Sequence, residues 1–245
     1  MLSGVMSGVM SGVMAVAACQ ASLADPPKPI PKPIPKPIPK PTPAPGYDHD
    51  AVVRFHMHQN FDLLRAIERL LIRGKLDEAK QFAEAIATAP DEPAHGPWAT
   101  QTLLVRDRAA ALARASSVED ALRKDTSLAS ACGSCHRELD VTLFKDHPAA
   151  PPDRPMLDAR MARHRWAADR LWEGVVGNAD EAWRAGLDVL AAAPLDLGEA
   201  RAPFARNLQQ LASTARRTKP AAPDRSTAYA ELLITCAGCH ALPRK

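Results

Sequence analysis

The residues best able to do chemistry in this chain are cysteines and histidines in two short, similar segments. The first reads Cys132-Gly-Ser-Cys135-His136 and the second reads Cys236-Ala-Gly-Cys239-His240. C-x-x-C-H is the attachment signature of a c-type haem. Two thiols three positions apart lie on one helical turn, so both can form thioethers with the porphyrin, and the adjacent imidazole can then bind the iron. The sequence therefore predicts two covalently bound c-type haems. The predicted attachment residues are Cys132, Cys135, Cys236 and Cys239, and the predicted iron ligands are His136 and His240.

Three other uses of a paired-cysteine motif explain these residues less well. Zinc sites built from two C-x-x-C pairs place the pairs about 15 to 20 residues apart, whereas these motifs are 104 residues apart, from 132 to 236. A thioredoxin-like motif needs a βαβ setting, and a structural disulfide gives no role to the adjacent histidines. A haem explains the cysteines and the histidines together.

The offset of 104 residues recurs elsewhere in the chain. Pro90 corresponds to Pro194, and Met57 corresponds to Met161. We interpret this as a tandem duplication, with one haem domain over residues 47–150 and a second over 151–245.

The apolar residues recur with helical periodicity throughout both units, and no run alternates as a half-buried strand would. Gly, Pro and a Ser116-Ser117-Val118-Glu119 capping box mark the expected helix ends. We predict an all-α fold in which each unit is a four-helix bundle. The expected helices cover 49–73, 76–89, 98–115 and 117–138 in the first unit, and 155–176, 179–192, 198–217 and 226–241 in the second.

A haem motif near the end of the last helix of a four-helix bundle resembles the cytochrome c-prime family and its low-spin relatives. The resemblance covers about residues 50–245, half of it in each unit. Family members commonly carry a basic residue a few positions after the histidine, whereas here Arg137 follows His136 directly and Arg244-Lys245 closes the chain. The resemblance implies that the first helix of each bundle covers the face of the haem opposite His136 or His240.

That first helix should supply a sixth iron ligand if the protein is an electron carrier, or leave the position open if it binds small molecules. In the segment His56-Met57-His58, Met57 lies on a largely apolar helical face, whereas His58 lies on a solvated one. Met161 is its counterpart in the second unit. We therefore predict Met57 and Met161 as sixth ligands, with a methionine that merely fills the core as the alternative. His164, one turn after Met161, is the main competitor in the second unit.

Residues 1–24 contain no charged side chain and end in small residues, which is typical of an export signal. Val16-Ala17-Ala18-Cys19 resembles a lipoprotein box, and Cys19 is the one cysteine outside the two motifs; Ser22-Leu23-Ala24 fits ordinary cleavage instead. Residues 25–46 repeat PKPI and should form an extended polyproline linker. We expect an exported protein in the periplasm or on the cell exterior, with Cys19 as a possible lipid anchor to the membrane.

The charge balance argues against nucleic acid as a partner. The chain has 31 Lys and Arg against 28 Asp and Glu, but residues 1–46 hold four of these lysines and one of the aspartates, which leaves 27 against 27. The basic excess therefore belongs to the linker.

We expect a dihaem electron carrier, not an enzyme, that exchanges electrons with redox proteins. The alternatives are a five-coordinate gas-binding or sensing protein, a dihaem peroxidase, and a scaffold without haem.

Overall fold

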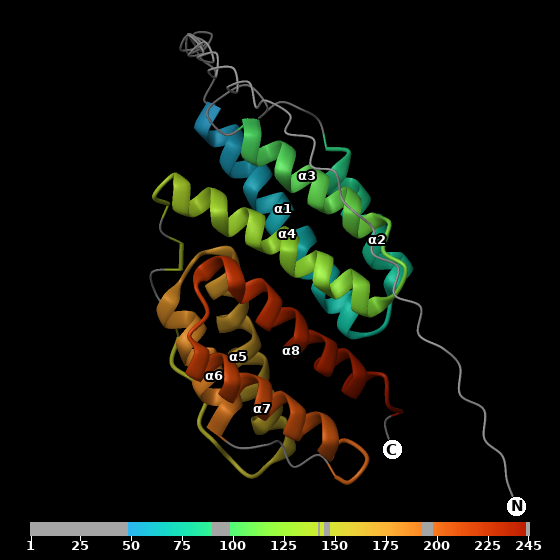
Figure 1. Ribbon diagram of the computed structural model, residues 1–245, viewed down its shortest axis with the longest axis vertical. Coiled ribbons are helices and arrows are strands. Elements are labelled where there is room, and N and C mark those ends of the chain that lie inside the picture. The colour runs from blue at the N-terminus through green and yellow to red at the C-terminus, as the bar shows by residue number, and fades with distance from the viewer. Residues whose placement is uncertain (1–48, 90–98, 142, 145–147, 193–197, 244–245) are drawn as a thin grey trace, which may run out of the picture. The chain divides into compact units, whose positions relative to one another are not determined.

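The computed structural model describes residues 49–89, 99–141, 143–144, 148–192 and 198–243 (Figure 1). Within these ranges the chain forms eight α-helices and the short 3₁₀ helix η2 (Ala222–Asp224), without a β-strand. The predicted all-α class is confirmed. The predicted export signal, Cys19 and the polyproline linker lie outside the described residues. No described helix is long and apolar enough to cross a membrane.

The helices form two sets of four with matching bounds. The last residues of α1 and α5 are 72 and 176, and the first residues of α2 and α6 are 76 and 180, so both pairs are 104 residues apart. This pattern is consistent with two helical bundles. The first set is α1 (His49–Ile72), α2 (Leu76–Ala87), α3 (Ala99–Ala113) and α4 (Val118–Glu138); the second is α5 (Leu157–Val176), α6 (Asp180–Ala192), α7 (Ala202–Thr218) and α8 (Arg225–His240).

The packing between helices repeats in the same way. Successive helices pack together within each set, and the first helix of each set also contacts the last. The two sets meet through their last helices, α4 and α8, which lie side by side, and each of these also contacts the first helix of the other set (Figure 1). The helices that carry the cysteine motifs are therefore neighbours.

Apolar residues at helical spacing explain why the helices associate. On α1, Leu64, Ile67 and Leu71 recur at intervals of three and four residues and are 4%, 0% and 0% exposed. Leu171 on α5 and Leu232 on α8 are likewise buried, and all five belong to one continuous hydrophobic cluster. Burial of one such side chain stabilises the fold by roughly 1.5 to 3 kcal/mol.

The start of α4 is fixed by a cap that lies one residue later than predicted. Ser117 is the N-cap residue, and its side chain accepts a hydrogen bond from the Asp120 backbone N–H at 3.1 Å. The Asp120 carboxylate in turn accepts from the Ser116 backbone N–H at 3.0 Å. The acid of the capping box is therefore Asp120, and the prediction that Glu119 fills this role is wrong.

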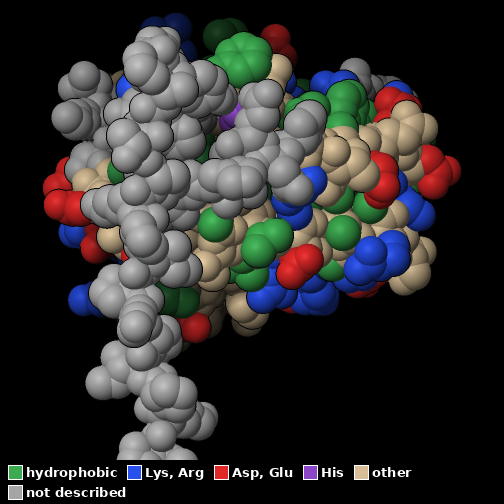
Figure 2. Space-filling view, turned by 90° about the horizontal axis from the view of Figure 1, so that it is seen from above, with side chains coloured by type: hydrophobic (Ala, Val, Ile, Leu, Met, Phe, Trp, Pro, Cys, Tyr) green, Lys and Arg blue, Asp and Glu red, His purple; other side chains and the backbone are tan. Residues whose placement is uncertain are grey.

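Charged side chains of both signs are interspersed on the face of the molecule shown in Figure 2. This agrees with the equal number of acidic and basic residues after position 46.

Candidate haem sites

The first cysteine motif occupies the end of α4. Cys132 and Cys135 are free thiols on one helical turn, and Cys135 is 5% exposed. Burial raises the pKa of Cys132 to about 12, with the neighbouring Cys135 as a second cause, and burial also raises the pKa of Cys135. Both thiols are therefore protonated at neutral pH, which makes uncatalysed reaction at the sulfur slow.

The ring of His136 is oriented by the end of α5. Its Nδ1 lies 2.8 Å from the backbone carbonyl oxygen of Val176. A carbonyl only accepts, so Nδ1 carries the proton and Nε2 keeps its lone pair. Burial lowers the pKa of His136, although the bond to Val176 acts in the opposite direction. A neutral imidazole that donates its other N–H to a backbone carbonyl is the usual arrangement of a metal-binding histidine.

A glycine allows this approach of α4 to α5. A Cβ atom added to Gly133 would lie 2.2 Å from the backbone oxygen of Val175. Only a residue without a side chain fits there, and Gly133 is the first residue between the two motif cysteines. The close helix contact thus places His136 within reach of Val176.

A cavity of about 610 Å³ lies beside His136. Its size is within the range of about 300 to 1,000 Å³ that small-molecule sites occupy. Phe144 and Gly177 form part of its lining, and Arg137 is held there by a 2.8 Å hydrogen bond to the Ser134 hydroxyl. Cys132 and Cys135 do not line this cavity, and Asp140, Asp180 and Glu181 do, so a haem is supported by the cysteine-histidine donor set at the end of α4 and not by the cavity.

Aromatic rings pack next to this cavity and connect the two sets of helices. Phe61 of α1 lies edge-on to Trp172 of α5, with ring centroids 4.8 Å apart, and both rings contact Phe144. Trp172 is 2% exposed, whereas Phe61 is 37% exposed. The apolar surface beside the first motif therefore includes residues of both halves.

The second cysteine motif ends α8. Burial raises the pKa of Cys236 to about 12, and burial also raises the pKa of Cys239 although the nearby Arg201 opposes this. Arg201 also donates to the carbonyl oxygens of Leu242 and Pro243, at 3.0 and 2.8 Å, and so holds the segment after the motif against the start of α7. As in the first motif, both thiols are neutral and free.

His164 of α5 is the residue that the structure associates with His240. Its Nδ1 is buried and has no hydrogen-bond partner among the described residues. Burial lowers the pKa of His164 to about 4, and the nearby charge of His240 acts in the same direction. The ring is therefore neutral at pH 7 and keeps a lone pair that can bind a metal.

The other predicted ligands lie on the first helix of each set. Met57 is 40% exposed on α1, and Met161 is half-buried on α5. His58 is exposed, whereas His56 is half-buried and lines a second cavity of about 600 Å³ between α1, α2 and α3. The assignment of Met57 and Met161 as sixth ligands stays a prediction. His95 and His147 lie outside the described residues.

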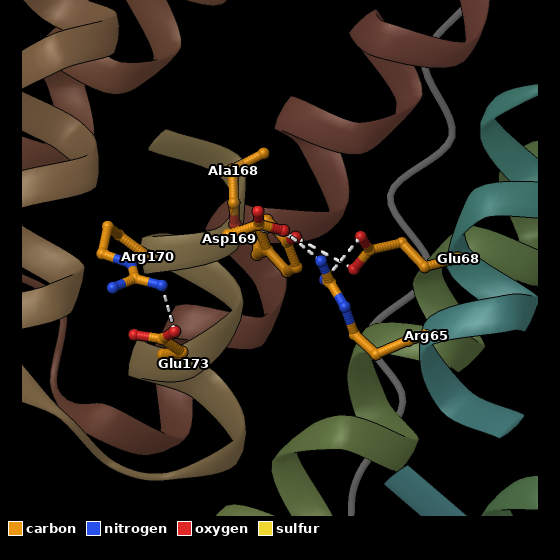
Figure 3. Close-up of polar contacts among 7 residues, drawn as sticks. Arg65, Glu68, Ala168, Asp169, Arg170 and Glu173 are labelled. Carbon is orange, nitrogen blue, oxygen red and sulfur yellow. Dashed lines mark hydrogen bonds and ion pairs between the residues drawn. The ribbon is translucent and has the colours of Figure 1, made fainter. Parts of the chain in front are cut away.

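Sequence reasoning missed a buried polar cluster where the two halves meet (Figure 3). Arg65 of α1 donates to Glu68 at 3.0 Å and also forms an ion pair with Asp169 of α5. The Tyr229 hydroxyl of α8 donates to the other oxygen of Glu68 at 2.9 Å. Arg65 and Asp169 are 104 residues apart, so the repeat offset is the signal that pairs these positions.

Comparisons of the chain with protein-family models, with curated proteins and with solved structures give no match.

Proposed function

We propose that this protein is a dihaem c-type cytochrome that carries single electrons between redox proteins. The observation that carries the proposal is the 2.8 Å contact of His136 Nδ1 with the Val176 oxygen, because it leaves Nε2 free beside two thiols on the same helix end. Cys132, Cys135 and His136 would hold one haem, and Cys236, Cys239 and His240 the other. A bound haem supplies a reversible one-electron couple.

The surrounding helices support electron transfer in two ways. They hold each histidine and its cysteines on a rigid helix, and they bring α4 and α8 together. Proximity of the motif helices favours electron exchange within one chain. Export and a lipid anchor at Cys19, with residues 25–46 as a spacer, complete the proposal and place the protein at an envelope membrane, where its partners are other redox proteins.

A five-coordinate gas-binding protein is the rival function, and carbon monoxide separates the two. We expect a low-spin spectrum with a sulfur-to-iron charge-transfer band and no change when carbon monoxide is added to the reduced protein. Haem counting by mass, together with a reduced-minus-oxidised spectrum, tests stoichiometry and ligation. Rapid binding of carbon monoxide to both haems would contradict the proposed carrier, and peroxide turnover would indicate a peroxidase.

The sixth ligands can be tested one at a time. Met57→Ala should convert one haem to a high-spin, carbon monoxide-binding form, because the thioether sulfur is lost, and Met161→Ala should do the same for the other. The measurement is the absorption spectrum of each variant at neutral pH. Leu157→Ala, which truncates an exposed side chain near the start of α5, serves as the control.

His164 provides the competing result for the second haem. If His164 binds this iron, His164→Ala will give the high-spin form and Met161→Ala will leave the spectrum unchanged. A second imidazole in place of a thioether would also lower the potential of this haem.

A further inference from the structure

Two buried carboxyl groups have no part in haem attachment or ligation. Glu68 of α1 is 4% exposed and Asp125 of α4 is 2% exposed. Acidic side chains are almost never buried this completely unless they are paired. Their environments differ, and the difference assigns them different protonation states.

Glu68 is the member of the pair whose carboxylate accepts hydrogen bonds from two donors. It accepts from the Arg65 guanidinium at 3.0 Å (Figure 3) and from the Tyr229 hydroxyl of α8 at 2.9 Å. Burial raises the pKa of Glu68, but the charges of Arg65 and Arg69 and the bond from Tyr229 oppose this. Two donors on one carboxylate compensate for much of the solvation that it has lost.

Asp125 is the protonated member. Its Oδ1 is buried and has no hydrogen-bond partner among the described residues. Burial raises the pKa of Asp125 well above its usual range, the negative charge of Glu68 raises it further, and only Arg65 acts against this. A carboxyl group in such a site stays neutral until a positive charge appears nearby.

The position of the pair connects it to both motifs. Asp125 lies seven residues before Cys132 and Tyr229 lies seven residues before Cys236, which is two helical turns or about 10 Å along the axis in each case. The charge of Asp125 acts on Cys132, and the charge of Glu68 acts on Cys236. One carboxyl group of the pair is therefore within electrostatic range of each motif.

We propose that Asp125, with Glu68 as its charged neighbour, binds a proton when the haems are reduced and releases it when they are oxidised. This inference rests on the proposed function. An electron from a redox partner converts ferric to ferrous iron and removes one positive charge. The Asp125 carboxylate then takes up one proton from the bulk solvent, where H3O+ becomes H2O, and the new O–H bond on Asp125 restores the charge. Other charged or titratable groups near the pair are Arg65, Arg69, Asp169, Tyr229, Cys132 and Cys236.

The sign of the effect follows from linkage. Oxidised iron is positive and lowers the proton affinity of Asp125, so the group has a higher pKa in the reduced protein. At a pH between the pKa of Asp125 in the oxidised protein and its pKa in the reduced protein, reduction takes up a proton. In this range the midpoint potential of the haem must fall as the pH rises, because protons become scarcer. For one proton per electron the slope approaches about 59 mV per pH unit, and it vanishes outside this range.

Potentiometric titration of the haem-loaded full chain from about pH 5 to about pH 9 tests the proposal. We expect a sloping region in the wild type and a flat line for Asp125→Asn, whose neutral amide has the shape of the protonated acid. Glu68→Gln should move the sloping region to lower pH, since loss of its charge lowers the pKa of Asp125. Glu119→Gln, an exposed carboxylate on the same helix, should leave the curve unchanged.

Infrared difference spectra supply a readout that does not depend on the potential. The reduced-minus-oxidised spectrum should contain a carbonyl band of a protonated carboxyl group, and Asp125→Asn should remove it. A haem-loaded protein with a flat titration and no such band would overturn this inference and leave the electron carrier intact. A chain without covalent haem after expression with maturation machinery would overturn the proposed function as well.

Discussion

Replacing Cys132 and Cys135 together by alanine is expected to halve the covalent haem content of the protein. Thioether bonds need the motif sulfurs, and the second pair, Cys236 and Cys239, lies on another helix and should still be loaded. Intact mass after denaturation measures the result directly, since a covalently bound haem stays with the chain. Because His136 remains, any haem still bound there should dissociate on unfolding.

The reciprocal double replacement at Cys236 and Cys239 is the matched control and should remove the other haem. The quadruple variant should contain none. Two haems retained by either double variant would show that the motif cysteines do not attach the cofactor, and the haem interpretation would fail for that half of the chain.

Gly133→Ala is expected to lower the free energy of unfolding by about 1 to 3 kcal/mol, the usual cost of an overpacked site. The new Cβ would meet the backbone oxygen of Val175 at 2.2 Å, and a backbone atom cannot move aside as a side chain can. Alanine favours a helix over glycine by about 1 kcal/mol, so the measured loss is net of that gain. Urea unfolding measures the change.

The same variant should alter the first haem, because separation of α4 from α5 lengthens the contact of His136 with Val176. The position one repeat later is Ala237, where a side chain is already present, and Ala237→Gly should cost about 1 kcal/mol by helix propensity alone. Wild-type stability in Gly133→Ala would mean that α4 and α5 do not approach each other this closely.

The helices could be predicted because their signals are local. Periodic apolar residues and helix-end residues such as Gly74 and Ser117 determine structure within a few helical turns of themselves. The expected and observed helix bounds therefore agree to within a few residues at most ends. Gly74 has a φ of 74°, a conformation that glycine adopts without strain, and this is why α1 ends there. The cysteine motifs were equally local, since both thiols and the histidine lie within one and a half turns.

The environment of the sites could not be predicted because it depends on contacts between distant segments. Val176 orients His136 from 40 residues away, and Tyr229 donates to Glu68 from 161 residues away. In sequence, Glu68 and Asp125 are ordinary polar residues of amphipathic helices. Only the packing of α1, α4 and α8 buries them. The apolar pattern of one helix shows which of its faces is buried but not which other helix packs against that face.

The ion pair of Arg65 with Asp169 joins positions that are equivalent under the proposed duplication, as happens at the axis of a two-fold symmetric dimer. In a dimer of identical subunits, such a position faces its own copy, so an arginine would meet an arginine. Under the proposed duplication a single gene encodes both copies, and this removes the restriction because each copy can mutate alone. The Arg65–Asp169 contact could thus acquire opposite charges, and the neighbouring Glu68 could acquire a hydrogen bond from Tyr229, so that the polar cluster between the two halves is not symmetric.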